Sequence, residues 1–341
     1  MAFWVVRAGK HGENESYALD NNLVAIGWED LGDISLAPSR EAIDELMQAT
    51  YRDTPRTTTR IWTGEVWALK DRMQIGDLVC LPLKGRSALA VGRIDGPYRF
   101  DGSAPAEAKH QRPVKWMRTD LPRTDLDQDI LFSLGSTLTV FQVKRNQAEE
   151  RLARIVEGGA KKTLPAIPAN QSSDVEPVDD QVPTNLEQFA ADQIAAFIGR
   201  KFRGHDLSRL VAEVLIAEGY KVFVSPPGAD GGVDILAGSG PMGFDAPKLA
   251  VQVKSSDTPC DVSVLRELQG VMPKFGADQG LIVSWGGYNR AVLKEARQLY
   301  FKIRLWDAGD VINAIKENHD NLSDEIQAEL PLKRIWTLIN D

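Results

Sequence analysis

The segment from residue 158 to residue 184 most constrains the fold of this chain, because it cannot join a hydrophobic core. It opens with Gly-Gly-Ala-Lys-Lys, and its later part holds four prolines and an acidic run: Pro165, Pro168, Pro177 and Pro183, with Asp174, Glu176, Asp179 and Asp180. Its few apolar residues follow no helical or strand period. Such a composition predicts a flexible, extended linker. The 341 residues therefore divide into a domain at 1–157, an acidic linker at 158–184 and a domain at 185–341.

Charge and composition narrow the class of protein. The net charge of −8 argues against a surface coated in basic residues for nucleic acid. Cys80 and Cys260 lie far apart, and none of the four histidines is paired at the spacing of metal ligands, so a zinc enzyme is disfavoured. No apolar run is long enough to span a membrane, and the N-terminus has no signal-peptide pattern. We therefore expect a cytoplasmic protein with reduced thiols and no membrane partner.

In the second domain, a glycine-rich turn runs into a strand that carries an acid. The stretch 228–236 reads Gly-Ala-Asp-Gly-Gly-Val-Asp-Ile-Leu, and a second strand is predicted at 249–254. Gln252 and Lys254 alternate with valines there, so they should share one face, and Asp234 can meet them from the adjacent strand. Carboxylate and amide oxygens suit Mg²⁺, and a lysine can orient water or neutralise charge on phosphorus. The pattern predicts a site for a divalent metal and a phosphate.

Each of these residues also has a structural interpretation. Asp234 could be an acid at the start of a strand, and Lys254 a solvated lysine at the end of one. Asp230 is expected to fix the glycine-rich turn by hydrogen bonding to its own backbone, with a contact to the metal as the alternative.

The rest of the second domain reads as alternating helices and strands. From Leu207 onward the predicted order is α-β-β-β-α-β-α-β-α, which indicates a mixed sheet flanked by helices. Asp206 is expected to cap the first of these helices, and residues 320–341 are expected to end the chain as a closing helix.

This second half resembles the Mrr family within the PD-(D/E)XK nuclease superfamily. The resemblance rests on the helix at 210–215, the segment 228–234, Val251-Gln252-Val253-Lys254 and the helices that follow. It implies a metal site of Asp234, the Gln252 side-chain oxygen and the Val253 backbone carbonyl, with Lys254 as a catalytic residue. The family often carries an acid in the first helix. Ser208 occupies that position here, so Glu213 is the nearest substitute, with an exposed helix residue as the alternative.

The first half has many short strands and few helices. Strands are predicted at 2–7, 23–28, 77–82, 88–94, 97–100, 113–117 and 138–144, and helices at 41–50, 58–72 and 146–156. The strand ending in Ala25-Ile26-Gly27-Trp28, the Gly76-Asp77 turn and the Arg112–Trp116 segment make this half similar to the PUA/EVE-like superfamily. The similarity implies a small β-barrel with helices that holds a modified or flipped base.

Trp28, Trp116 and Arg112 are the candidate base-reading residues. Both tryptophans lie at strand ends beside charged residues, and a base taken out of a helix stacks on aromatic faces. Most tryptophans in such a domain belong to the core, which is the alternative for each. The cations between Lys84 and Arg123 predict either a local phosphate-contacting face or an ordinary solvated surface.

Together these patterns predict a two-domain α+β and α/β protein. We expect an N-terminal reader and a C-terminal nuclease that uses Mg²⁺, with Mn²⁺ as a substitute, to cut foreign double-stranded DNA with modified bases, as a homodimer. One alternative is a defence nuclease that a small nucleotide or a protein signal activates through the N-terminal domain. Another is a nucleic-acid-binding module with a catalytically dead nuclease core.

Overall fold

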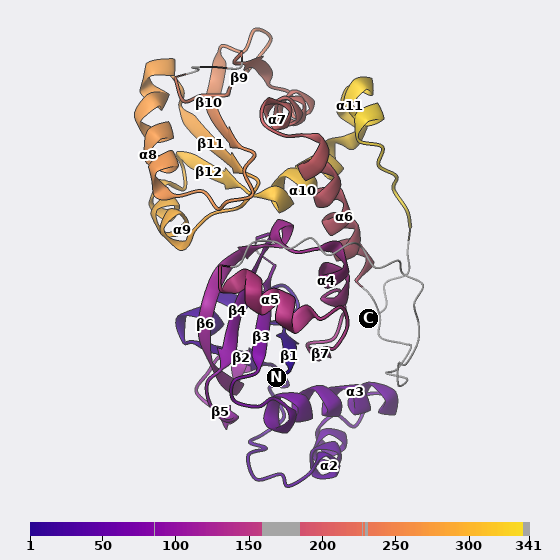
Figure 1. Ribbon diagram of the computed structural model, residues 1–341. Coiled ribbons are helices and arrows are strands. Elements are labelled where there is room, and N and C mark those ends of the chain that lie inside the picture. Colours follow the sequence, from indigo (N-terminus) through magenta and orange to yellow (C-terminus); the bar gives the residue numbers. More distant parts are fainter. Residues whose placement is uncertain (85, 159–184, 227, 229–230, 337–341) are drawn as a thin grey trace. The chain divides into compact units, whose positions relative to one another are not determined.

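The computed structural model describes residues 1–84, 86–158, 185–226, 228 and 231–336 (Figure 1). Packing divides the chain into two units, one of Met1–Leu121 with Asp125–Leu186 and one of Pro122–Thr124 with Glu187–Asp341. The predicted linker falls outside the described residues, apart from Gly158. Among the described helices, none has both the length and the hydropathy that crossing a membrane requires.

A curled sheet of seven strands organises the first unit. Its order is β2-β6-β4-β3-β1-β7, with β5 paired to β6. The strands are β1 (Phe3–Val6), β2 (Leu23–Ile26), β3 (Leu78–Leu83), β4 (Ala88–Ile94), β5 (Arg99–Phe100), β6 (His110–Pro122) and β7 (Val140–Val143). Apolar residues of its strands face both sides of the sheet. The predicted mixture of short strands and helices is confirmed, but the strand predicted at 113–117 is the middle of the much longer β6.

Helices cover both sides of this sheet. They are α1 (Glu15–Asp20), α2 (Arg40–Thr50), α3 (Arg56–Trp67) with its continuation η1 (Ala68–Arg72), α4 (Gln128–Ser133) and α5 (Ala148–Val156), with short turns at η2 (Ala106–Ala108) and η3 (Arg123–Asp125). Helices α2, α3 and η1 pack against Trp4, Val24 and Val79 on one side. Helices α4 and α5 pack against Phe3, Cys80 and Val91 on the other. The sequence patterns missed α1 and α4, since six residues are too few to display a helical period.

The second unit is built on a mixed sheet of five strands. Its order is β12-β11-β10-β9-β8, in which β8, β9 and β10 run antiparallel and β10, β11 and β12 run parallel. The strands are β8 (Lys221–Val224), β9 (Ile235–Ser239), β10 (Asp245–Lys254), β11 (Gln279–Ser284) and β12 (Ile303–Trp306). The predicted mixed sheet flanked by helices is confirmed.

Two groups of helices cover the two faces of this sheet. The helices are α6 (Leu186–Lys201), α7 (His205–Ala217), α8 (Val262–Val271), α9 (Arg290–Ala296), α10 (Ala308–Asn318) and α11 (Asp324–Glu329), with short turns at η4 (Met272–Phe275), η5 (Arg297–Leu299) and η6 (His319–Asn321). Helices α7 and α10 pack with Ile235, Val251 and Val283. Helices α8 and α9 pack with Ala250 and Ile282, which point the other way.

Two local expectations in this unit are wrong. Asp206 lies inside the first turn of α7, whose N-cap is Gly204, so it does not cap the helix. Of the predicted closing helix, the part described, up to residue 336, holds only η6 and the six residues of α11. Pro331 follows directly, and proline cannot continue a helix because it lacks the backbone N–H.

Candidate active site

The ladder between β9 and β10 brings the predicted site residues together. Ile235 pairs with Val251, so the next position outward sets Asp234 opposite Gln252. Lys254 follows two residues later and therefore points to the same face. Gln252 has the same orientation as Ala250, which packs under α8 and α9. All three side chains thus lie on the α8/α9 face, where β10 ends.

The carboxylate of Asp234 is fixed by the backbone. Its Oδ2 accepts a hydrogen bond from the amide of Val253 at 2.7 Å, and its own amide donates to the carbonyl of Val251 at 2.9 Å. The N–H and the C=O of one strand residue point to the same side in an antiparallel ladder. The Val253 carbonyl therefore faces the Asp234 side, beyond the point where β9 begins at Ile235.

Gln252 carries a buried oxygen that has no partner within the described structure. The side chain is 3% exposed, and its Oε1 accepts no hydrogen bond. Leaving such an acceptor unsatisfied costs about 1–3 kcal/mol. A hard cation would satisfy it, because amide and carboxylate oxygens are ordinary ligands of Mg²⁺. This orphaned oxygen, beside Asp234 and the Val253 carbonyl, fits a divalent metal.

The donor set has a single acid. Among the described residues, no three His, Cys, Asp or Glu side chains are grouped so that they could hold a metal. Any metal at this place would therefore be held by one carboxylate, one amide and one carbonyl, supplemented by water or phosphate oxygens.

Lys254 is half-buried, and a loop that the sequence patterns missed holds its backbone. The carbonyl of Lys254 accepts a hydrogen bond from the amide of Trp285 at 2.8 Å, and Ser284 lies opposite Lys254 in β11. The loop after β10 meets the loop after β11 in a bridge between Cys260 and Tyr288. The Trp285-Gly286-Gly287 sequence directly after an apolar strand was the signal that could have revealed this loop.

Cys260 lies near Lys254 but is a poor nucleophile. Its side chain is buried, and burial raises the pKa of the thiol to about 11. The group therefore stays a neutral thiol near pH 7, where a reactive cysteine would need to be a thiolate.

Glu213 does not reach this site, contrary to expectation. Helix α7 begins beside the end of β10, where the amide of Gly204 donates to Ser255 Oγ at 3.0 Å. Glu213 is eight residues after His205, which is about 12 Å along a helix. Helix α7 also covers the opposite face of the sheet. Ser208, at the position of the family's acid, is 3% exposed.

Arg112 is a structural residue rather than a reader. It is 3% exposed, and its guanidinium donates to the carbonyls of Gly96, Leu69 and Lys70 at 3.0, 3.2 and 3.3 Å. These bonds tie β6 to η1 and use the donors that a base would need. Arg112 therefore binds the protein's own backbone and is not a base-reading residue.

The two tryptophans remain candidates for the reading site. Trp28 is half-buried in a left-handed conformation with φ of 62°, and its ring lies 6.2 Å from that of Trp62 in an edge-to-face arrangement. Tyr51 packs edge-on against the same Trp62 at 5.4 Å. The indole N–H of Trp116 is buried without a hydrogen-bond partner in the described structure.

The cations between Lys84 and Arg123 are largely used within the protein. Arg118 forms ion pairs with Asp120 and Asp125, Arg93 donates to the carbonyl of Gly76, and Arg86 donates to that of Thr119. These contacts favour the ordinary surface over a phosphate-contacting face.

Two family models match the chain. Residues 199–315 match the restriction endonuclease model Mrr_cat, and residues 4–140 match a domain of unknown function, DUF8426. The comparison with curated proteins gives no match. The PUA/EVE-like character of the first unit thus stays a prediction.

Three solved structures are similar to the chain. The first is the crystal structure of a protein of unknown function, AF1548, with 15% identity over 30% of this chain and a TM-score of 0.24. The second is the DNA modification-dependent restriction endonuclease AspBHI, with 14% identity over 82% of this chain and 74% of its own length, at a TM-score of 0.34. The third is the MspJI restriction endonuclease in complex with a 27-mer oligonucleotide, with 16% identity over 96% of this chain and 79% of its own, at 0.31.

These likenesses are too distant to fix a fold or a function, and the chain spans only 56% of the length of AF1548. The family match covers the residues that place Asp234, Gln252 and Lys254 at the end of one sheet. Residues 199–315 are therefore a restriction endonuclease domain of the Mrr type.

Proposed function

We propose that this chain is a Mg²⁺-dependent endonuclease that cuts phosphodiester bonds in double-stranded DNA. The observation that carries the proposal is the buried, unpartnered Oε1 of Gln252, opposite Asp234 and two residues before Lys254. An acceptor that costs stability when empty is best explained by a cation that fills it.

The chemistry follows from the groups present. Asp234, Gln252 Oε1 and the Val253 carbonyl would hold Mg²⁺, which when bound polarises the phosphate and lowers the pKa of water. The hydrogen bond from the Val253 amide orients the Asp234 carboxylate before substrate arrives. The ammonium of Lys254 positions the attacking water and neutralises charge that builds on the phosphate oxygens.

We further propose that the first unit makes cleavage depend on a modified base, as in type IV restriction. The support is the aromatic group of Trp28, Tyr51 and Trp62 and the unsatisfied indole N–H of Trp116. Aromatic rings stack on a base, and an indole N–H donates to a base carbonyl. Here the rings are half-buried against the core of the first unit, so a base would have to displace part of that packing. A homodimer in the cytoplasm would allow both strands of foreign DNA to be cut.

A cleavage assay tests the nuclease. With millimolar Mg²⁺, or Mn²⁺ in its place, the full chain should cut DNA, whereas Asp234→Asn and Lys254→Ala should reduce the rate at least about 10³-fold. Glu213→Gln is the matched control and should keep nearly full activity, because that carboxylate lies on the other side of the sheet. Undiminished restriction by the Asp234→Asn protein would establish a binding module instead.

Substrates that differ only in modification test the reader. The full chain should prefer methylated, hydroxymethylated or glucosylated DNA over plain DNA, and Trp28→Ala or Trp116→Ala should remove the preference while plain DNA is still cut. Equal cleavage of all substrates would contradict the proposal that the first unit recognises a modified base and would favour activation by another signal.

A further inference from the structure

A strip of exposed cations runs along the end of α9 and the start of β12. Residues 290–304 contain five cations, Arg290, Lys294, Arg297, Lys302 and Arg304, against one acid, Glu295, in a chain whose net charge is −8. All five are exposed, and we call four of them, Lys294, Arg297, Lys302 and Arg304, the basic strip. Such a local excess of positive charge in an acidic protein needs an explanation.

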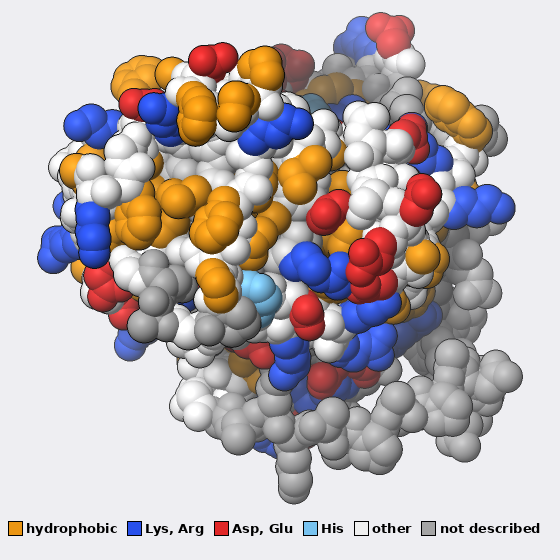
Figure 2. Space-filling model, turned by 90° about the horizontal axis from the view of Figure 1, so that it is seen from above, with side chains coloured by type: hydrophobic (Ala, Val, Ile, Leu, Met, Phe, Trp, Pro, Cys, Tyr) orange, Lys and Arg blue, Asp and Glu red, His pale blue; other side chains and the backbone are white. Residues whose placement is uncertain are grey.

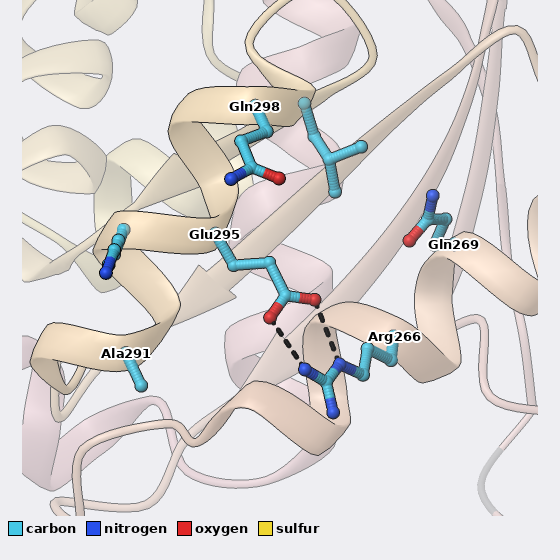
Figure 3. A pocket seen from close by; sticks show the side chains of 7 residues that line it. Arg266, Gln269, Ala291, Glu295 and Gln298 are labelled. Atoms are coloured by element: carbon cyan, nitrogen blue, oxygen red, sulfur yellow. Dashed lines mark hydrogen bonds and ion pairs between the residues drawn. The ribbon is translucent and has the colours of Figure 1, made fainter.

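The charge of the basic strip is not neutralised locally. No ion pair within the described part of the chain involves Lys294, Arg297 or Lys302. The one acid among them, Glu295, is held instead by Arg266 of α8, whose Nε and Nη2 each lie 2.9 Å from its carboxylate oxygens. Figure 3 shows this two-pronged contact between the helices. Arg266 thus neutralises Glu295, so the one acid among residues 290–304 does not offset the positive charge of the strip.

A groove borders the strip between α8 and α9. Its volume is about 540 Å³, and Lys294, Gln269 and Gln298 line it together with the Arg266–Glu295 pair (Figure 3). Amide and ammonium groups donate hydrogen bonds to phosphate and sugar oxygens, which receive more than half of the hydrogen bonds in protein–DNA complexes. Ala291 and Leu299 complete the lining, so the groove offers donors for a nucleic-acid backbone beside an apolar wall.

Two exposed aromatic rings lie within the strip. Tyr300 is 55% and Phe301 86% exposed, and the guanidinium of Arg304 stacks 3.6 Å from the centre of the Tyr300 ring. Figure 2 shows the whole face seen from above, without labelling the strip; hydrophobic side chains and lysine and arginine side chains both occur on that face. Aromatic rings between cations are typical of surfaces that bind nucleic acids.

Part of the strip lies on the catalytic side of the sheet. Lys294 belongs to α9 and Arg297 to its continuation η5, whereas Arg304, next to Ile303 in β12, points to the opposite face at the sheet edge. Helix α9 covers the face from which Gln252 and Lys254 project. The start of β12 at Ile303 is level with Gly280 of β11, which is level with Ala250 of β10. Ala250 is four residues before Lys254, so the separation is about 13 Å along the strand and about 10 Å across two ladders.

We propose that the basic strip binds the sugar–phosphate backbone of the duplex that flanks the cleaved bond. The separation, about 16 Å, corresponds to about five base pairs at about 3.4 Å each. The strip would thus anchor the substrate without reading its sequence, and it would set how much duplex must extend beyond the cut. This proposal rests on the proposed endonuclease function for its DNA substrate.

Binding to a plain 30-base-pair duplex (about three helical turns) in EDTA tests the strip apart from cleavage. The double variant Lys294→Glu with Lys302→Glu should weaken binding by at least about 10-fold near 0.1 M salt and lower the slope of log K against log salt by about 2. The milder Lys294→Gln with Lys302→Gln should show a smaller loss in the same direction. Lys333→Glu, the same charge change per substituted lysine on the chain after α11, is the control and should bind like the unaltered protein.

For a second variant we expect a gain in DNA affinity. Glu295→Gln releases Arg266 and removes the acid, so DNA affinity should rise several-fold and the salt slope should steepen. In parallel, affinity for duplexes of increasing flank should step up at about five base pairs in the unaltered protein but not in the double variant.

Unchanged affinity in both the Glu295→Gln protein and the double variant would overturn the proposal, whether or not the protein cuts DNA. Unchanged DNA binding combined with a loss of self-association in sedimentation would assign the strip to a protein interface instead. Loss of cleavage in Asp234→Asn with intact strip binding separates the two proposals, because metal-free binding does not use the catalytic groups.

Discussion

At the scale of single residues, the second unit depends on groups whose burial conflicts with their polarity. Gln252 is the clearest, because a neutral amide occupies a place where a carboxylate would bind a cation more strongly. A neutral ligand reduces electrostatic attraction, so we expect the site to need millimolar Mg²⁺.

Replacing Gln252 tests this reasoning. Gln252→Glu should lower the Mg²⁺ concentration for half-maximal cleavage about 10-fold, which corresponds to about 1.4 kcal/mol, at a pH where the new carboxylate is ionised. Gln252→Leu should raise that concentration or abolish cleavage, since it removes the oxygen. A metal titration that is unchanged in both variants would exclude Gln252 as a ligand.

Glu65 of α3 shows the same conflict in the first unit. Its Oε1 accepts hydrogen bonds from the amides of Thr139 and Val140, yet burial raises the pKa of the carboxyl from 4.5 to about 7. The folded state therefore holds the proton more tightly than the unfolded state does. The free energy of unfolding should fall as pH rises from about 4.5 to about 7 and then level off.

Glu65→Gln should remove this dependence. Relative to the unaltered protein, the variant should gain up to about 3 kcal/mol at pH 8 over its difference at pH 4, as measured by denaturant unfolding of the first transition. Glu45→Gln on the exposed side of α2 serves as the control and should leave the pH profile unchanged. A Glu65→Gln profile parallel to that of the unaltered protein would contradict the assignment.

At the scale of elements, two loops lock the end of the sheet. A Cβ atom on Gly286 would lie 2.5 Å from the carbonyl carbon of Asp257 and 2.6 Å from that of Thr258. The loop after β11 therefore fits against the loop that follows Lys254 only because position 286 is glycine. The bridge between Cys260 and Tyr288 fastens the same two loops further along.

Gly286→Ala should push these loops apart and displace Lys254. We expect kcat to fall about 10²-fold, since misplacing a reacting group by about 1 Å has that effect, while metal-free DNA affinity changes little. Gly270→Ala in α8 is the matched control, because a Cβ there meets nothing within 4 Å, and helix propensity predicts up to about 1 kcal/mol of added stability. Equal kinetics for the two variants would contradict the proposal that the packing of Gly286 against Asp257 and Thr258 positions Lys254.

At the scale of the whole molecule, each unit has its own core. The first unit is closed by apolar groups around Trp4 and Phe3, and the second by groups on both faces of β10. Cores without shared members should unfold in separate steps, as in other proteins with several domains.

Calorimetry with and without metal should separate the units. Two transitions are expected, and 10 mM Mg²⁺ should raise only the one that belongs to the nuclease unit. For a dissociation constant of about 1 mM the gain is about 1.4 kcal/mol, or about 3 °C for a unit of this size. Asp234→Asn should cancel the shift. An equal shift in both transitions would place the metal elsewhere.

The sequence by itself determined the order of elements in the second unit and the grouping of Asp234, Gln252 and Lys254. Strand geometry puts residues two apart on one face, and adjacent strands bring their ends together, so local pattern was enough. The same reasoning failed at the tail, where Pro331 follows α11 and the predicted helix does not continue. It also failed at 113–117, where the observed strand β6 is far longer than its apolar pattern indicates.

Only the tertiary structure decided which of the remaining candidates could act. Arg112 bonds to carbonyls up to 43 residues away in the chain, Glu213 lies on the far side of the sheet, and Trp285 holds Lys254 from the loop after β11. The basic strip likewise keeps its positive charge because Arg266 neutralises Glu295, an acid 29 residues away in the chain. Each of these roles depends on contacts between distant segments, which exist only once the sheet and its helices have packed together.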